Sequence, residues 1–372
     1  MGRNQQGIMG KRRHLAPWGR KAEALRALEP DAGPADQEVL AALEGKPAIY
    51  HCVSRVVWRE LALGEAEKEH FVRLMRRWEA FCQVRVLTYC VMTNHFHILV
   101  EVPERPAQDP TDEELLRHLG LIYGRAKVAE IGQEIRHWRE RELDGKAEEL
   151  RQRFLSRMWD LSWFVRQLKQ AFTKWFNKRH EKKGHLWEER FRSLLVEEGK
   201  AARVVAGYID LNPVRAGIVK DPAGYRWSGW GEAVAGRRKA REGIRQTMLE
   251  RELGRSGATR ALGDVADWLD VQQAYAELLR EDRDGAGDGA QGGGGRGGGN
   301  AGRVRLSEAE LLRHKVRYFV DGMVIGMKGF VDGVFQLSRG WFGGDRRDGA
   351  RRIPGTATDL TTMRTLRVRP MD

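Results

Sequence analysis

The sequence predicts an α+β fold, because stretches with strand periodicity and stretches with helix periodicity follow one another in mixed order. Residues 48–57 and 84–102 are apolar, rich in β-branched residues and partly alternating, which is typical of strands. Residues 65–82 and 162–180 repeat apolar residues every three or four positions, which is typical of amphipathic helices. The first four elements are therefore expected in the order strand, helix, strand, strand.

Local signals set the limits of these elements. Pro47 precedes the first strand at 48–57. The apolar stretch 84–102 is too long for one strand, and Thr93-Asn94 suits a hairpin turn within it. We therefore expect one strand on each side of this turn. The later elements expected are a strand at 193–196, a helix over 199–217 that stops near Asn212-Pro213, and a helix over 258–280.

Composition divides the chain of 372 residues into five parts. These are a basic arm over 1–46, a main domain over 47–230 with a charged helical insertion at about 104–160, a helical extension over 231–283, a Gly-rich linker over 284–302 that is expected to be disordered, and a small C-terminal segment with a basic tail over 303–372.

The formal net charge of +13 favours a polyanionic partner, and nucleic acid is the commonest one. Nine Lys or Arg stand against three acidic residues between Arg166 and Arg192, with aromatic residues among them. Such residues can pair with phosphates and stack on unpaired bases. The candidate DNA-binding residues are Lys178, Arg179, Lys182, Lys183, Trp187, Arg190, Arg192 and Arg215.

The cysteines and the apolar runs favour a cytoplasmic protein. Cys52, Cys82 and Cys90 are odd in number and have no CxxC spacing, so we expect reduced thiols rather than a disulfide framework. The N-terminus lacks the apolar core of a signal peptide, and no apolar run is long enough to span a bilayer. A membrane partner is therefore not expected.

His95-Phe96-His97 is the strongest chemical signal in the chain. Successive side chains of a strand point to opposite faces, so both histidines are expected on one face and Phe96 on the other. Two imidazoles on one face can share a divalent metal ion. The alternative is a pair of structural histidines.

Tyr208 and Asn212 form a second constellation, because residues four apart on a helix share a face. A phenol is a poor nucleophile at neutral pH, but a metal that polarises a phosphate makes its attack feasible. The alternative is a half-buried structural tyrosine. Tyr225 is the second candidate nucleophile.

Four blocks in order resemble the REP-associated tyrosine transposases, relatives of the single-tyrosine HUH transposases of small bacterial insertion sequences. The resemblance covers about residues 47–230, and residues 316–330 resemble a C-terminal extension of some relatives. The blocks are the strand 91–102, Gly184-His185-Leu186-Trp187 with Arg190-Phe191-Arg192-Ser193, the stretch 208–217, and Tyr225-Arg226-Trp227-Ser228.

The resemblance implies a ferredoxin-like α/β sandwich, an antiparallel sheet with helices on one face. It implies that His95 and His97 bind Mg²⁺ or Mn²⁺, and that Tyr208 attacks a DNA phosphate to give a 5′-phosphotyrosine bond and a free 3′-hydroxyl. Asn212 has the spacing of the family's third ligand. The implied partner is single-stranded hairpin DNA, in the cytoplasm and at the nucleoid.

The chain departs from the family at Phe172 and Trp175, where many relatives have tyrosines. Two other functions stay open beside the transposase: a domesticated protein that binds hairpin DNA or RNA without cutting it, and a metal-dependent hydrolase that uses water. The resemblance is compatible with a homodimer and with a monomer.

Overall fold

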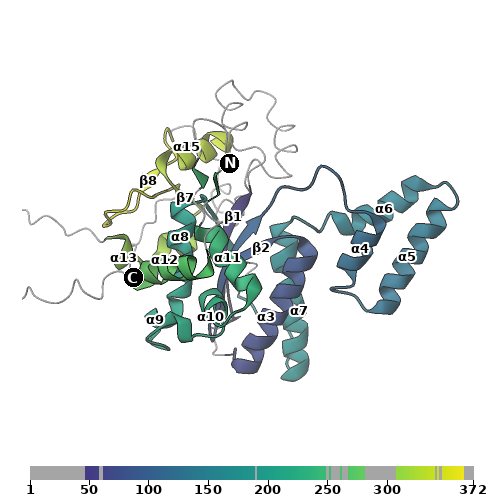
Figure 1. Cartoon of the computed structure of the whole chain (residues 1–372), viewed down its shortest axis with the longest axis horizontal. Helices are drawn as coiled ribbons and strands as arrows, with labels where there is room; N and C mark the ends of the chain where they lie inside the picture. The colour runs from purple at the N-terminus through teal and green to yellow at the C-terminus, as the bar shows by residue number, and fades with distance from the viewer. Residues whose placement is uncertain are drawn as a thin grey trace, which may run out of the picture. The chain divides into compact units, whose positions relative to one another are not determined.

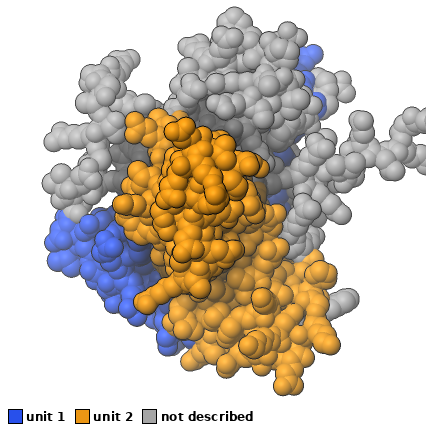
Figure 2. Space-filling model, turned by 90° about the vertical axis from the view of Figure 1, so that its right-hand side faces the viewer, with its two compact units in different colours: residues 1–14, 194–372 blue, residues 15–193 orange. Residues whose placement is uncertain are grey.

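The computed structural model describes most of the chain between residues 47 and 363. The described residues are 47–57, 62–188, 191–248, 251–252, 260–261, 267–280, 307–339, 342 and 346–363. The predicted arm at 1–46, the Gly-rich linker and Arg190 lie outside them. The chain forms two compact units, residues 1–14 with 194–372 (unit 1) and residues 15–193 (unit 2), coloured in Figure 2. Their boundary falls inside the predicted 47–230 domain, whose limits stay a prediction.

Unit 2 contains an antiparallel sheet in which β3 (His95–Val102) lies between β1 (Ala48–Arg55) and β2 (Arg85–Val91). Helix α3 (Glu65–Cys82) joins β1 to β2, and α7 (Leu161–Arg179) follows later in the chain (Figure 1). The α+β class and the predicted order of the first four elements are confirmed. The β-α-β-β-α order, with β3 central, is that of a ferredoxin-like fold.

The hairpin turn between β2 and β3 is at the predicted place. Thr93 and Asn94 connect the two strands, and the backbone N–H of Met92 donates to the carbonyl of His95 at 2.8 Å.

One face of the unit 2 sheet is covered by α3 and α7. The ring of Phe71 on α3 lies 4.8 Å from that of Phe96 on β3 and 5.3 Å from that of Phe172 on α7. All three rings are fully buried, so they form the core between sheet and helices. Because side chains alternate along a strand, His95 and His97 lie on the face that points away from these helices.

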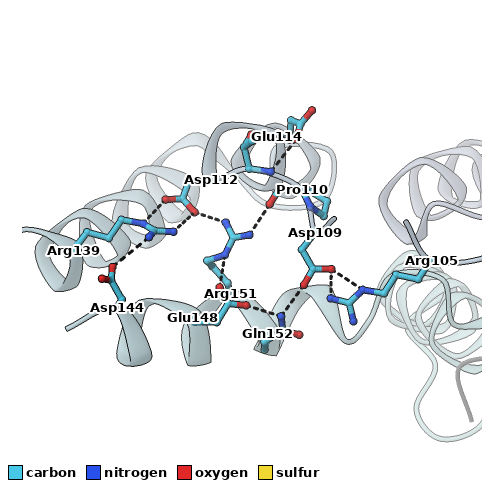
Figure 3. Close-up of polar contacts among 11 residues, drawn as sticks. Arg105, Asp109, Pro110, Asp112, Glu114, Arg139, Asp144, Glu148, Arg151 and Gln152 are labelled. Carbon is cyan, nitrogen blue, oxygen red and sulfur yellow. Dashed lines mark hydrogen bonds and ion pairs between the residues drawn. The ribbon is translucent and has the colours of Figure 1, made fainter. Parts of the chain in front are cut away.

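The insertion consists of α4 (Asp112–Leu119), α5 (Arg125–Arg139) and α6 (Asp144–Leu155). Its helices share a small apolar core that includes Leu115, Leu119, Ile131, Ile135 and Leu150. A polar network runs beside this core (Figure 3). The carboxylate of Asp112 accepts a hydrogen bond from Nε of Arg139 at 2.7 Å. It accepts another from the buried Arg151.

We expect Asp112→Asn to destabilise the insertion by about 1–2 kcal/mol at neutral pH, because Arg139 and Arg151 lose the carboxylate that they share, while Arg151 keeps its ion pair with Glu148. The hydrogen bond from Arg139 lowers the pKa of Asp112 against the opposing effect of burial, and Arg151 adds to the lowering. A lowered pKa in the folded state means that this stabilisation is present above the unfolded pKa and lost as the pH falls through the folded pKa. Hydrogen exchange of α4–α6 should therefore differ between variant and wild type at pH 7 and converge at low pH.

Asp144→Asn is the matched control for this measurement. Its carboxylate also meets Arg139, but at 3.4 Å and with three quarters of the side chain exposed. We expect little change in the exchange of α4–α6. Equal protection of wild type and Asp112→Asn at pH 7 would contradict the role given to the network.

Distant parts of the chain contribute strands to unit 1. Strand β7 (Val324–Gly326) pairs in parallel with β4 (Arg192–Val196) and antiparallel with β9 (Thr361–Thr362), which pairs with β8 (Arg351–Arg352). Residues predicted as a separate small segment, 303–372, thus supply three strands to the unit that contains Tyr208.

The remaining elements of unit 1 are mostly helical. They are α8 (Lys200–Asp210), α9 (Asn212–Arg215), η3 (Pro222–Gly224), α10 (Gly229–Val234), α11 (Arg238–Met248), β5 (Arg251–Glu252), β6 (Arg260–Ala261), α12 (Trp268–Arg280), α13 (Glu308–Arg313), α14 (Arg317–Asp321) and α15 (Lys328–Leu337). Among the described residues, every helix is too short or too polar to cross a membrane.

Candidate active site

His95 and His97 lie together on the helix-free face of β3, as the strand alternation predicts. Their ring centroids are 5.0 Å apart and the rings are nearly perpendicular. His97 is almost completely buried, whereas His95, at the start of the strand, is half-buried. Arg55 pairs with His95 across β1 and β3, so a cation lies on the same face.

Each histidine uses its Nδ1 atom for a contact with a neighbour. Nδ1 of His95 lies 2.7 Å from the side-chain oxygen of Asn94. Since that oxygen can only accept, Nδ1 donates in this contact, and in the neutral ring Nε2 then carries the lone pair. Nδ1 of His97 lies 2.9 Å from Nε2 of His51 on β1, with the two rings stacked.

This arrangement fits a divalent cation. When Nδ1 of His97 donates to His51, both histidines present an Nε2 lone pair, the form in which imidazole binds metal. Within the described part of the chain, there is no group of three or more His, Cys, Asp and Glu side chains that could hold an ion. A complete coordination shell would therefore need another type of ligand, such as an amide, water or the substrate phosphate.

His51 is a functional candidate that reasoning from the sequence missed. It is buried in the neighbouring strand, and its only signal in the sequence was a histidine inside a predicted apolar strand. Partners of this kind fix the tautomer and the ring orientation of a metal-binding histidine.

We expect His51→Ala to weaken Mn²⁺ binding about 10–100-fold, because His97 would lose the group that orients it. Calorimetric titration of the full-length chain with Mn²⁺ measures this change. Cys52→Ala is the control, since Cys52 is buried in the same strand and points to the opposite face. Unchanged Mn²⁺ affinity in His51→Ala would show that His51 is only structural.

Tyr208 lies on α8 and is 2% exposed. The ring of Phe319 meets it edge-on, with centroids 5.0 Å apart, and the guanidinium carbon of Arg215 lies 4.0 Å from the centre of its ring. Asn212 is half-buried at the start of α9, and Leu211 separates the two helices. The predicted break near Asn212-Pro213 is therefore present, as expected from a proline without an N–H.

Asp210 anchors the end of α8. Its carboxylate is fully buried and accepts hydrogen bonds from the Tyr275 hydroxyl at 2.7 Å and from the backbone N–H of Trp230 at 3.1 Å. Burial, together with the charge of Asp210, raises the pKa of Tyr275 well above its usual value, so that the phenol stays a hydrogen-bond donor. The helix that carries Tyr208 is thus tied to α10 and α12.

Tyr225, the second candidate nucleophile, is also buried. Its ring meets that of Trp227 with centroids 5.5 Å apart, just before α10. Burial and an edge-on ring contact are therefore common to Tyr208 and Tyr225.

The candidate DNA-binding residues fall into two groups. Lys178, Arg179, Lys182, Lys183 and Arg192 are exposed at and after the end of α7. Trp187 is in the core of unit 2 instead, where its ring packs on Phe71 and Phe96 and its Nε1 donates to Thr173 at 3.0 Å. Arg215 donates to the backbone carbonyls of Tyr208 and Leu312.

The sequence-predicted site residues divide between the units. His95 and His97 belong to unit 2, and Tyr208 and Asn212 belong to unit 1.

The chain matches a family model in part and is similar to a solved structure. Residues 46–110 match the family model described as "Transposase IS200 like", so the matched segment includes both histidines and ends before Tyr208. No curated protein matches the chain. The solved structure, "Structure of the REP associates tyrosine transposase bound to a REP hairpin", is 15% identical with a TM-score of 0.32, over 51% of this chain and 80% of that chain.

Proposed function

We propose that this chain, which is related to the IS200-like transposases over residues 46–110, is a single-tyrosine DNA nickase and strand transferase that acts on single-stranded DNA hairpins. One observation carries the proposal: His95 and His97 share a face of β3 inside the matched segment, and contacts at Nδ1 favour Nε2 as the metal-binding atom. We place its action in the cytoplasm, on nucleoid DNA.

His95 and His97, with Asn212 as a third ligand, would hold Mg²⁺ or Mn²⁺, which would polarise the scissile phosphate. The phenol oxygen of Tyr208 attacks phosphorus, so that a Tyr–O–P bond forms and the bond from phosphorus to the 3′-oxygen breaks. The phenol loses its proton, and the 3′-oxygen leaves with a proton as a hydroxyl. One phosphodiester replaces another, which makes the step reversible and permits strand transfer.

The exposed cations at the end of α7 are suited to hold the hairpin. Lys178, Arg179, Lys182 and Lys183 lie within six successive positions, so several phosphates can be neutralised in one stretch. Arg192 adds a cation at the start of β4, and affinity should fall steeply with salt.

A hairpin-binding protein without cleavage activity is the second candidate function. The observation in its favour is that Tyr208 is buried. A phenol has to reach a phosphate in order to cleave DNA, and a buried phenol is shielded from one.

A single experiment separates these functions. The full-length protein is incubated with an end-labelled single-stranded hairpin oligonucleotide from its own genome's repeats and Mn²⁺, and the products are run on a denaturing protein gel. A metal-dependent labelled band at protein mass supports the nickase. Retarded but uncut DNA supports the binding protein, and cleaved DNA without an adduct indicates water as the nucleophile.

A further inference from the structure

Tyr208 is enclosed by residues from a much later part of the chain. Phe319 on α14 is fully buried and meets the tyrosine ring edge-on at 5.0 Å. Helix α13 packs so closely on α8 that a Cβ atom at Gly207 would lie 3.2 Å from Cδ1 of Leu312. Both helices and α8 belong to unit 1, so these contacts form within one compact body.

Arg215 joins Tyr208 to that later segment. One terminal nitrogen donates to the carbonyl of Tyr208 at 2.6 Å and the other to the carbonyl of Leu312, also at 2.6 Å. The guanidinium carbon lies 4.0 Å from the centre of the tyrosine ring, within the range of a cation–π contact. A planar fork with several donors can make these contacts together, which a single ammonium group cannot.

The three contacts restrict Tyr208 in different ways. The bond to its carbonyl fixes the backbone of α8, the guanidinium covers one ring face, and Phe319 limits rotation of the ring. A nucleophile at the end of a side chain with two rotatable bonds needs such restriction, since misplacement by about 1 Å can cost about 100-fold in rate.

We propose that Arg215 and Phe319 are positioning residues for Tyr208, which makes α13 and α14 part of the catalytic apparatus. The proposal rests on the proposed function, because it takes Tyr208 as the nucleophile. It gives the C-terminal segment a role in cleavage beyond the three strands that it supplies to unit 1.

The test compares full-length Arg215→Ala, Arg215→Lys and Phe319→Leu with wild type. Adduct formation is followed in single turnover, with the labelled hairpin at saturating concentration and Mn²⁺ present. We expect Arg215→Ala and Phe319→Leu to lower the adduct rate about 10–100-fold while the hairpin Kd changes less than about threefold. Arg215→Lys should recover part of the rate, because it keeps the cation and loses the fork.

Arg241→Ala is the matched control. Arg241 also donates to a backbone carbonyl, that of Ala233 at 3.0 Å, and covers an aromatic ring, that of Trp268 at 4.8 Å. The Arg241→Ala variant therefore loses the same two kinds of contact as Arg215→Ala, at another place in unit 1. The adduct rate of this variant should stay within about twofold of wild type.

A second measurement is independent of activity. Nitration by tetranitromethane, read at the Tyr208 peptide by mass spectrometry, reports how well the ring is enclosed. Arg215→Ala and Phe319→Leu should accelerate nitration of Tyr208, and Arg241→Ala should not.

Four results would overturn the proposal: an unchanged adduct rate in Arg215→Ala, a faster one, an equal loss in Arg241→Ala, or unchanged nitration. A wild-type protein that forms no adduct would instead overturn the proposed function.

Discussion

Tyr208→Phe is expected to abolish the covalent adduct and strand cleavage, while hairpin binding stays within about threefold of wild type. The substitution removes one oxygen and keeps the ring that packs against Phe319 and Arg215. The loss should therefore be chemical rather than structural. A denaturing gel reports the adduct, and a mobility-shift titration at fixed salt reports binding.

Tyr225→Phe is the control for this result, because it removes the same atom from another buried tyrosine in unit 1. It should keep full adduct formation. An adduct that persists in Tyr208→Phe and disappears in Tyr225→Phe would transfer the role of nucleophile to Tyr225. Cleavage that survives in both variants would leave water as the nucleophile.

The periodicity of the sequence was sufficient to predict which faces of β3 and α3 form the core of unit 2. Strand alternation placed His95 and His97 on the face opposite Phe96, and helical spacing gave α3 at its observed limits. These predictions succeeded because they depend on which face a residue occupies, and that face is set by local geometry.

The contacts around the candidate catalytic residues could not be predicted in this way. Periodicity shows that a residue is buried but not which residue packs on it. The contacts of His51 with His97 and of Phe319 with Tyr208 each join different elements. Trp187 illustrates the same limit, since an aromatic residue among cations suits both a base-stacking surface and a core, and the structure places it in the core.

His97→Ala is the second substitution with a large expected effect. It removes the more deeply buried of the two imidazoles and leaves His51 without the ring on which it stacks. Because a partner outside the metal shell is worth about 10–100-fold in affinity, loss of a ligand itself should lower Mn²⁺ affinity and adduct formation by more than about 100-fold. Calorimetry with Mn²⁺ and the adduct gel measure the two losses separately.

The two histidines should act as a pair. If both bind one ion, His95→Ala reduces Mn²⁺ affinity by a similar factor, and the double variant is hardly worse than either single variant, because the remaining histidine binds weakly alone. His118→Ala is the control, since His118 lies on α4 of the insertion and contacts Gln83 at 3.3 Å. If both single variants keep wild-type Mn²⁺ affinity but lose the adduct, His95 and His97 contact the DNA itself, and the metal in the proposed reaction has to be held elsewhere.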